Sequence, residues 1–532
     1  MIELALSLYL FFSVKYVNSV YSPPTSEQFQ SCLSSNHCNS TFKSPINLAK
    51  VHTPDSRIYT DFSESSSSLN SSFFSLNFTS LKPILTLKPK SETEIKKAIL
   101  CSKKLGVQVR TLSGGHDYEG LSYLSQSPFI IIDLVNLRSI NINLKDDTAW
   151  IQSGATLGEL YYKIAKASKI LAFSAGICPS VGVGGHISGG GFGTIMRKHG
   201  LASDNVVDAH LMDVNGIIRD RKAMGEDLFW ALRGGGAASF GVVLSWKVKL
   251  VRVPEKVTCF ISQHPMGESM NKLVHRWQFI GAELDQDLFI RVIIDNSQEG
   301  NQRKVKTTFQ ALFLGGIDRL IPLMNKKFPE IGLRAQDCSE MSWIESIMFF
   351  NWKSGQPLET MLDRDQRYED LYFKAKSDFV QKPVPENVFG EVTKRFLEKE
   401  TPLMILEPLG GKISEVSETE SPYPHRRGNL YNIQYMVKWK VNEVEEMNKH
   451  VRWMRSLYDY MSPYVSSSPR GAYLNYRDLD LGTTKGINTS FEDAQEWGER
   501  YFRGNFKKLG LVKGKIDPTN FFRNEQSIPP LF

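Results

Sequence analysis

The chain has 532 residues, of which 41% are hydrophobic and 23% charged, and its 64 basic and 57 acidic side chains leave a net charge of only +7. This length predicts two or three domains, and the composition is typical of a soluble globular protein. The charges are well mixed and form no long basic run in the sequence, so we expect no nucleic-acid partner, because such a partner needs a concentrated positive face.

The N-terminal residues have the pattern of a secretory leader. The apolar run from Leu4 to Val14 is too short to span a bilayer, and we expect a signal peptide over residues 1–21 although Glu3 stands where a positive charge is usual. The alternative is a buried N-terminal strand. Four glycosylation sequons agree with secretion and stand at Asn39, Asn70, Asn77 and Asn488. No later stretch has the pattern of a membrane span, so we expect no stable membrane insertion.

The six cysteines include no CxxC pair, which argues against a zinc ribbon or a thioredoxin-type motif, and no metal site is predicted. In an oxidising compartment we expect one or two disulfides. A pair between Cys32 and Cys101 would pin the N-terminus to the first domain. Cys178 lies among glycines, where a thiol is accessible, and we expect Cys259 and Cys338 to be buried free thiols.

Short helices and strands alternate through the first half of the chain, up to about residue 254. Apolar spacing and β-branched runs predict these elements. In chain order they are a helix at Thr93–Leu105, strands at Val107–Leu112, Phe129–Leu134 and Trp150–Gly154, a helix at Leu157–Ala167, a strand in 206–216, a helix in 225–233 and a strand at Val242–Val248. This alternation predicts an α+β domain that binds a nucleotide cofactor.

The pattern of predicted elements changes between about residues 255 and 471. Strands are expected in LFIRVIID, TTFQALFLG and LYNIQYMVKWK, with helices such as Val441–Met461 between them. This pattern indicates an antiparallel sheet with helices on one face. The last sixty residues return to short elements.

Three glycine-rich loops are expected to cradle a large ligand: Ser113–His116, Gly182–Gly193 and Gly234–Gly241. Bare backbone can bring its N–H groups close to an anion. The chain contains neither the P-loop pattern GxxxxGK[ST] nor the Rossmann pattern GxGxxG, which argues against kinase-type ATP sites and Rossmann-type nicotinamide sites. One histidine and one cysteine, His116 and Cys178, accompany these loops and suggest a covalently tethered cofactor.

Several motifs together resemble one known family. RTLSGGHDYEGLSY, CPSVGVGGHISGGGFG, GEDLFWALRGGGAASFG, NYRDLDLG and NFFRNEQSIPPL are similar, in the same order, to motifs of the berberine bridge enzyme-like flavoproteins of plants. The motif NYRDLDLG and the tail are especially similar to those of the cannabinoid-synthase branch.

The resemblance implies a fold and a cofactor. The fold would be the α+β FAD-linked oxidase fold of the vanillyl-alcohol-oxidase type, with a two-part FAD-binding domain at 22–255 and 473–532 and a central antiparallel-sheet substrate domain at 256–472. It also implies bicovalent FAD, with His116 bonded to the 8α-methyl carbon and Cys178 to C6 of the flavin ring. Imidazole and thiolate can both add to an electron-poor flavin.

Further cofactor contacts are expected from the glycine loops and nearby segments. Besides His116 and Cys178 they are Ser113, Gly114, Gly115, Asp117, Val181, Gly182, Gly185, His186, Gly189, Gly190, Gly191, Gly193, Val243 and Asn475. Val181 stands three residues after the cysteine, where valine resembles the oxygen-reactive members of the family. We therefore expect O2 as the second substrate and hydrogen peroxide as a product.

The strand at 432–439 should carry catalytic groups. Its alternation puts Gln434, Met436 and Lys438 on one face, which should look toward the flavin. Some family members have Glu where this chain has Gln434, but an amide cannot remove a proton, so Gln434 would only orient the substrate. The alternative is an edge-strand residue that faces solvent.

Tyr476 is the expected replacement base, by resemblance to the cannabinoid synthases. A tyrosine is a poor base at neutral pH unless a cation lowers its pKa, and Lys438 is expected to supply that cation. Tyr118 is the second candidate. If the segment around Tyr476 is a strand, Tyr473 faces the opposite way. Expected substrate-wall residues are Arg291, Trp343 and Phe350.

The expected function is oxidation, with possible cyclisation, of a phenolic, prenylated-phenol or alkaloid metabolite by hydride transfer to flavin N5. One alternative is a non-redox cyclase of the Diels–Alder type on the same scaffold, and another is a monolignol or carbohydrate oxidase, because the fold does not fix the substrate. We expect a monomer in the secretory pathway, in the cell wall, the vacuole or an ER-derived vesicle.

Overall fold

The computed structural model describes most of the chain. The described residues are 23–35, 51–52, 81–265, 267–300, 302–364, 372–399, 401–441, 443–484 and 489–532. The expected leader at 1–21 and the sequons at Asn39, Asn70, Asn77 and Asn488 lie outside these ranges and stay predictions. Within these ranges, no helix combines the length and the apolarity that a bilayer crossing needs.

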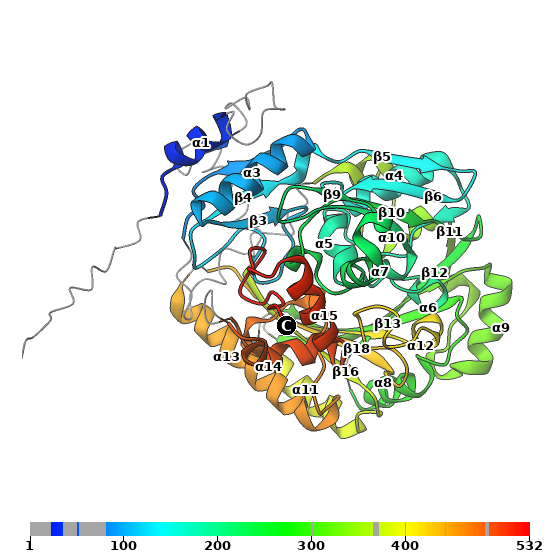
Figure 1. Cartoon of the computed structure of the whole chain (residues 1–532). Helices are drawn as coiled ribbons and strands as arrows, with labels where there is room; N and C mark the ends of the chain where they lie inside the picture. Colours follow the sequence, from blue (N-terminus) through cyan, green and yellow to red (C-terminus); the bar gives the residue numbers. More distant parts are fainter. Residues whose placement is uncertain are drawn as a thin grey trace, which may run out of the picture.

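The first sheet in the early part of the chain has four strands (Figure 1). Their spatial order is β1 (Val51–His52), β2 (Thr86–Leu87), β4 (Phe129–Asp133) and β3 (Gln108–Leu112). Strands β3 and β4 run parallel, and alternate residues of β4 enter two different apolar clusters, so its continuous apolar run is buried on both faces. Helix α3 (Glu92–Leu105) covers one face; its N-cap is Ser91, two residues before the expected start.

The second sheet is antiparallel and has five strands. Their order is β5 (Ile140–Asn143), β6 (Thr148–Gln152), β10 (Val242–Lys249), β8 (Val206–Met212) and β9 (Ile218–Arg219). Helices α4 (Leu157–Ala167) and α7 (Arg221–Leu232) share its core. Residues Thr156 and Glu159 form a capping box that starts α4, which explains why its predicted bounds were right.

The longest glycine-rich stretch is only partly a loop. It contains one short helix, α5 (Val183–Ser188), which the glycine content did not predict, and a second, α6 (Met196–His199), follows it. In α5 the side chains Val183 and Ile187 lie one turn apart and are both fully buried, so tertiary packing overrides the low helix propensity of glycine.

The centre of the chain forms a seven-stranded sheet in which all neighbouring strands are antiparallel. In spatial order the strands are β15 (Cys338–Met341), β12 (Val257–Pro265), β14 (Gln302–Phe313), β13 (Leu288–Glu299), β17 (Pro402–Pro408), β18 (Tyr431–Trp439) and β16 (Tyr372–Val380). This sheet confirms the predicted α+β class.

Helices cover one face of the central sheet. The helices that share its apolar core are α8 (Glu268–Ile280), α9 (Ile317–Lys327), α11 (Glu386–Leu397) and α13 (Val444–Met461). Strand β18 shows the alternation: Ile433, Tyr435 and Val437 enter this core, whereas Gln434, Met436 and Lys438 line a cavity on the other face. The predicted two-faced strand is confirmed, and Gln434 is not a solvent-facing edge residue.

The C-terminal residues return to the first part of the chain, so the red segment of Figure 1 lies beside the green and blue ones. Helices α14 (Phe491–Phe502) and α15 (Asn505–Ile516) join the core of the second sheet. The buried Lys513 Nζ donates to Ser239 O at 2.6 Å. Both chain ends therefore frame one cavity, and the expected domain boundaries stay predictions.

The N-terminal helix α1 (Ser26–Ser34) is attached to α3 by the predicted disulfide between Cys32 and Cys101. Phe29 and Leu33 bury fully in the same apolar cluster as α3. Of the free thiols, Cys259 is buried as expected, whereas Cys338 is only half-buried because it lies at the first position of the edge strand β15.

We predict that replacing Cys32 and Cys101 together with serine lowers the free energy of unfolding by about 4 kcal/mol, because the disulfide closes a loop between cysteines 69 residues apart. Chemical denaturation of the purified protein measures this. The partly exposed thiol variant Cys338→Ser is the control and should unfold within about 1 kcal/mol of the wild type. Equal midpoints for the double variant and the wild type would contradict the prediction.

Candidate functional site

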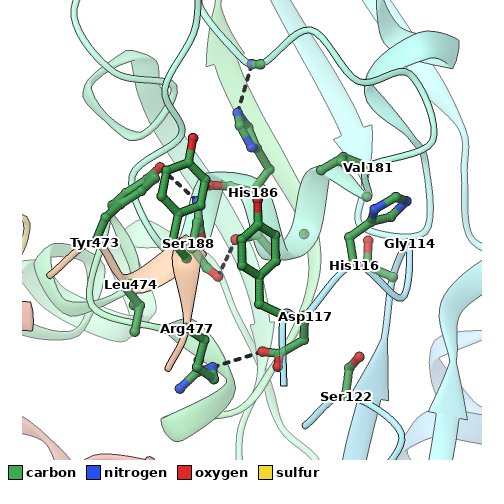
Figure 2. A pocket seen from close by; sticks show the side chains of 18 of the residues that line it. Gly114, His116, Asp117, Ser122, Val181, His186, Ser188, Tyr473, Leu474 and Arg477 are labelled. Atoms are coloured by element: carbon green, nitrogen blue, oxygen red, sulfur yellow. Dashed lines mark hydrogen bonds and ion pairs between the residues drawn. The ribbon is translucent and has the colours of Figure 1, made fainter. Parts of the chain in front are cut away.

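A cavity of about 600 Å³ lies between the three glycine-rich loops and the open face of the central sheet. Lining residues come from within 113–118, 176–194 and 235–241 in the loops, and from 473–477 in the C-terminal segment. Thus the three loops that the sequence singled out meet around one space. Figure 2 shows His116 beside Val181 on one side of it and Tyr473 and Leu474 on the other.

Two of the loops touch through bare backbone. A Cβ built on Gly114 would lie 2.2 Å from the backbone nitrogen of Gly182, and one on Gly182 would lie 2.1 Å from Ser113 Oγ. No larger residue fits at either position unless one of the two loop backbones moves. This contact holds His116 and Cys178, each a few residues away, on the same cavity.

Most of the expected cofactor contacts line the cavity. They are Ser113, Gly114, Gly115, His116, Asp117, Cys178, Val181, Gly182, Gly185, His186, Gly193, Val243 and Asn475. Three glycines do not: Gly189, Gly190 and Gly191. They serve close packing instead, since a Cβ on Gly189 would meet Asn475 Oδ1 at 2.0 Å, and Gly190 and Gly191 have φ values of +117° and +87°.

The surroundings of His116 and Cys178 affect differently how readily each side chain could form a bond to a cofactor. Burial lowers the pKa of His116 to about 4, so the imidazole is neutral at physiological pH and has a lone pair available for bond formation. Burial raises the pKa of the Cys178 thiol, and the Arg291 guanidinium acts in the opposite direction. A cation near the sulfur favours the thiolate, which is the reactive form.

The cavity walls fit an FAD molecule. Several buried polar atoms in them, including Ser153 Oγ, Arg477 Nη1 and Arg523 Nε, have no hydrogen-bond partner among the residues that the structure describes. Arg477 is held by Asp117, whose Oδ2 accepts from Nε at 2.9 Å (Figure 2). Buried polar groups are normally paired, so these atoms indicate a polar ligand. A hydroxyl, guanidinium groups and backbone N–H groups can hydrogen-bond to the ribose and pyrophosphate of FAD.

The two candidate tyrosines lie together against the sheet. Tyr118 and Tyr476 stack with their ring centroids 5.3 Å apart, and Gln434 Nε2 donates to the Tyr118 hydroxyl at 2.5 Å. Gln434 therefore orients a tyrosine, in line with a positioning role. Tyr473 does not face away from Tyr476: the segment is a 3₁₀ turn (Leu474–Tyr476) rather than a strand, and both rings line the cavity.

Tyr476 is a weak base in this setting. Burial raises its pKa well above the usual value, and the carboxylate of Glu407 raises it further. This is the opposite of the lowering by Lys438 that the sequence suggested, although Lys438 does line the cavity. Burial likewise raises the pKa of Tyr118.

Glu407 is the functional residue that sequence reasoning missed. It lies on β17, whose alternate residues Leu403, Ile405 and Glu407 face the cavity while Met404 and Leu406 enter the core. Its Oε1 lies 3.8 Å from Arg291 Nη1. The alternation of MILEP was a usable signal: the only carboxylate in that strand shares a face with apolar wall residues.

The expected wall residues divide into two groups. Arg291 and Phe350 line the cavity, and the guanidinium of Arg291 lies 5.1 Å from the Phe350 ring centroid. Trp343 does not line it: at the start of α10 (Trp343–Phe350) it is buried against Tyr161. Trp352, which the sequence did not single out, lines the cavity while 63% exposed, so it stands at the mouth.

A buried ion network holds the two tyrosines in place. It joins Lys374 and Lys376 on β16 to Glu119, Asp478 and Asp480. Lys374 Nζ lies 2.6 Å from Glu119 Oε1 and 2.8 Å from Asp478 Oδ1. Glu119 follows Tyr118 and Asp478 lies two residues after Tyr476, so the sheet fixes both tyrosine-bearing segments through these charges.

Comparisons with known proteins agree with this site. The sequence matches the family models described as FAD binding domain, over residues 83–221, and as berberine and berberine like, over residues 472–529. It is 84% identical over 530 residues to berberine bridge enzyme-like 22 of Arabidopsis thaliana, with 100% of both chains covered.

More distant relatives have named activities. The chain is 48% identical to monolignol oxidoreductase AtBBE-like 13 of Arabidopsis thaliana, over 84% of each chain. It is 46% identical to tetrahydroberberine oxidase of Berberis wilsoniae, covering 91% of this chain and 92% of that protein.

Solved structures show the same fold. BBE-like 28 from Arabidopsis thaliana superposes with a TM-score of 0.86 at 44% identity, covering 95% of this chain and 100% of that one. Wild-type Phl p 4.0202, described as a glucose dehydrogenase, superposes with a TM-score of 0.87 at 41% identity. An isoleucine-to-valine variant of Phl p 4, described as a glucose oxidase, has a TM-score of 0.87 at 42% identity. Each alignment covers 95% of this chain and 99% of the other. Phl p 4 is described as a grass pollen allergen.

We predict that Asp478→Asn lowers the free energy of unfolding of the flavin-loaded protein by about 3–5 kcal/mol, because it leaves excess buried positive charge at Lys374 and Lys376. Denaturant titration measures the loss. Burial acts to raise the pKa of Asp478, but the two ammonium groups outweigh it and lower the pKa. The stabilisation is therefore present above the unfolded-state pKa of the carboxyl and is lost as the pH falls through the lower folded-state value.

The matched control is Glu226→Gln, which removes the exposed partner of Arg221. That variant should unfold within about 1 kcal/mol of the wild type, since exposed pairs contribute little. Equal stability of Asp478→Asn and Glu226→Gln would show that the network does not support the fold.

Proposed function

This chain belongs to the berberine bridge enzyme-like family of FAD-linked oxidases, and we propose that it is a secreted oxidase that carries bicovalent FAD and oxidises a phenolic substrate, with O2 as the electron acceptor. The observation that carries the proposal is the single cavity in which His116, Cys178 and the glycine loops face the polar side of the central sheet. Closeness to the cannabinoid-synthase branch stays a prediction.

Each side of the cavity has its own part in the reaction. His116 and Cys178 would hold the flavin from the two loops that meet at the Gly114–Gly182 contact, and Arg477 and Ser153 would bind its polar portion. Bound FAD would supply a two-electron acceptor and pass the electrons to O2. The protein would orient the substrate hydroxyl on the sheet and receive its proton.

The substrate class is inferred from the opposite wall. Tyr118, Phe350, Phe373 and Tyr476 give it aromatic surfaces, and Trp352 stands at the mouth. Flat rings bind well between such side chains, while the sheet offers Gln434 and other polar groups to a hydroxyl. A phenolic alcohol of the monolignol type is the first substrate to test, in keeping with the relative that is 48% identical.

Secretion is proposed on two grounds. The disulfide between Cys32 and Cys101 is typical of an oxidising compartment. The expected leader at 1–21 and the sequons agree with it. We propose a monomer.

We predict that the denatured wild-type chain keeps its flavin, visible as fluorescence on a denaturing gel. His116→Ala and Cys178→Ala should each retain flavin through the remaining bond, and the double variant should release it. Cys338→Ser, a thiol outside the cavity, is the control and should retain flavin like the wild type. A wild-type chain without flavin would refute the covalent assignment. Covalent flavin without peroxide on any phenolic substrate would favour the non-redox cyclase instead.

We predict that Val181→Ile slows reoxidation of the reduced enzyme by O2 about ten-fold, the effect of a barrier raised by about 1.4 kcal/mol. The added methyl group would narrow the cavity beside His116 (Figure 2). This direction matches the glucose dehydrogenase and the glucose oxidase variant of Phl p 4, which differ by an isoleucine-to-valine change. Stopped-flow absorbance measures reoxidation, and reduction by substrate in the same sample provides the comparison. Unchanged reoxidation would exclude Val181 from oxygen access.

A further inference from the structure

Glu407 presents an unsatisfied acceptor to the substrate side of the cavity. The residue lines the cavity, and its Oε2 is buried with no hydrogen-bond partner in the part of the chain that the structure describes. A buried carboxylate oxygen without a partner is costly in a folded protein and calls for an explanation, such as a ligand that donates to it.

A row of polar side chains across three neighbouring strands fixes this carboxylate. Gln310 on β14 is paired in register with Arg291 on β13, and its Oε1 accepts from Arg291 Nε at 3.0 Å and Nη2 at 2.6 Å. These bonds leave Nη1 to point at Glu407 Oε1, 3.8 Å away on β17. The row ends at Tyr476, which lies close enough to Glu407 to act to lower the pKa of its carboxyl.

Burial raises the pKa of Glu407 above the usual range, while Arg291 and Tyr476 oppose this rise. The titratable groups that face the carboxylate are Arg291 on β13, Tyr118 in the first glycine-rich loop, Cys178 in the second, and Tyr473 and Tyr476 in the C-terminal segment. The cation of Lys438 and the neutral amide of Gln434 line the same cavity. A carboxylate of raised pKa is a better proton acceptor near neutral pH than a tyrosine whose own pKa is pushed well above its usual value.

We propose that Glu407 Oε2 accepts the proton of the substrate hydroxyl, and that Tyr476 positions that hydroxyl rather than deprotonating it. This inference rests on the oxidase function proposed above and names the substrate class as hydroxyl-bearing: an alcohol or a phenol. It places the acidic group on the strand next to Gln434.

The proton and electron transfers balance for an alcohol. The O–H bond breaks, the proton moves to Glu407 Oε2, and the electron pair of that bond forms the second C–O bond of the product. The carbon-bound hydrogen leaves with its electron pair as a hydride equivalent, which the oxidised flavin of the holoenzyme accepts. The protonated carboxyl then returns its proton to solvent before the next turnover.

The test compares flavin-loaded Glu407→Gln with Tyr476→Phe and the wild type. Flavin content and unfolding midpoint are recorded first, to establish that each variant is folded. The anaerobic rate of flavin reduction by a phenolic alcohol is then measured against pH. In the wild type this rate should rise with pH as Glu407 loses its proton, and Glu407→Gln should be slower and lack this rise, whereas Tyr476→Phe should be slower but keep it.

Two further readouts do not depend on turnover. Phenol, which has no oxidisable carbon, should bind about ten-fold more weakly to Glu407→Gln, since a charge-assisted hydrogen bond is lost. Infrared difference spectra between low and high pH should show the C=O band of a protonated carboxylic acid in the wild type that is absent in Glu407→Gln.

A pH dependence that survives in Glu407→Gln but disappears in Tyr476→Phe would overturn the inference and assign the proton to Tyr476. Unchanged phenol binding and an unchanged infrared band in Glu407→Gln would also overturn it. These outcomes differ from failure of the oxidase proposal itself, in which the wild type would form no peroxide. Phenol affinity and the infrared band would still decide whether Glu407 receives a hydroxyl proton.

Discussion

The buried charges between β16 and the loops are the interaction on which the site depends. Lys374 contacts three carboxylates and Lys376 two, and these carboxylates belong to segments more than three hundred residues apart in sequence. Because a buried ion is stable only with its partners in place, the sheet, the first glycine turn and the C-terminal turn must assemble together. The stacked Tyr118 and Tyr476 then follow as a consequence of where Glu119 and Asp478 are held.

A second constraint acts on the cofactor side. At Gly114 and Gly182 two loops approach so closely that neither position tolerates a Cβ without displacement of the other backbone. This contact is made by glycine backbone and Ser113 Oγ, and it joins the two segments whose residues His116 and Cys178 line the same cavity. The ion network positions the groups that handle the substrate, and the glycine contact positions those that would hold the flavin.

Local patterns predicted the parts of the structure that local forces decide. The bounds of α4 follow from its capping box, and the two faces of β18 follow from strict alternation. The roles of Gly189, Gly190 and Gly191 were not predictable, because glycine is equally suited to line a ligand and to admit a neighbouring side chain such as Asn475. Trp343 was misplaced for a similar reason: an aromatic residue at a helix start gives no information about which side it packs on.

Glu407 shows why acid–base chemistry is the hardest part of such a site to derive from one sequence. The strand that carries Gln434 has no carboxylate, which led to Tyr476 as the base. Folding places β17 between β13 and β18. The carboxylate of Glu407 therefore lies beside Arg291, on the strand next to the one that carries Gln434. Sheet order, which depends on long-range pairing, therefore decides which side chain meets the substrate. A shift of β17 by one residue would turn Glu407 into the helix-covered core, where its charge could not be accommodated, so the register and the chemistry of the site depend on each other.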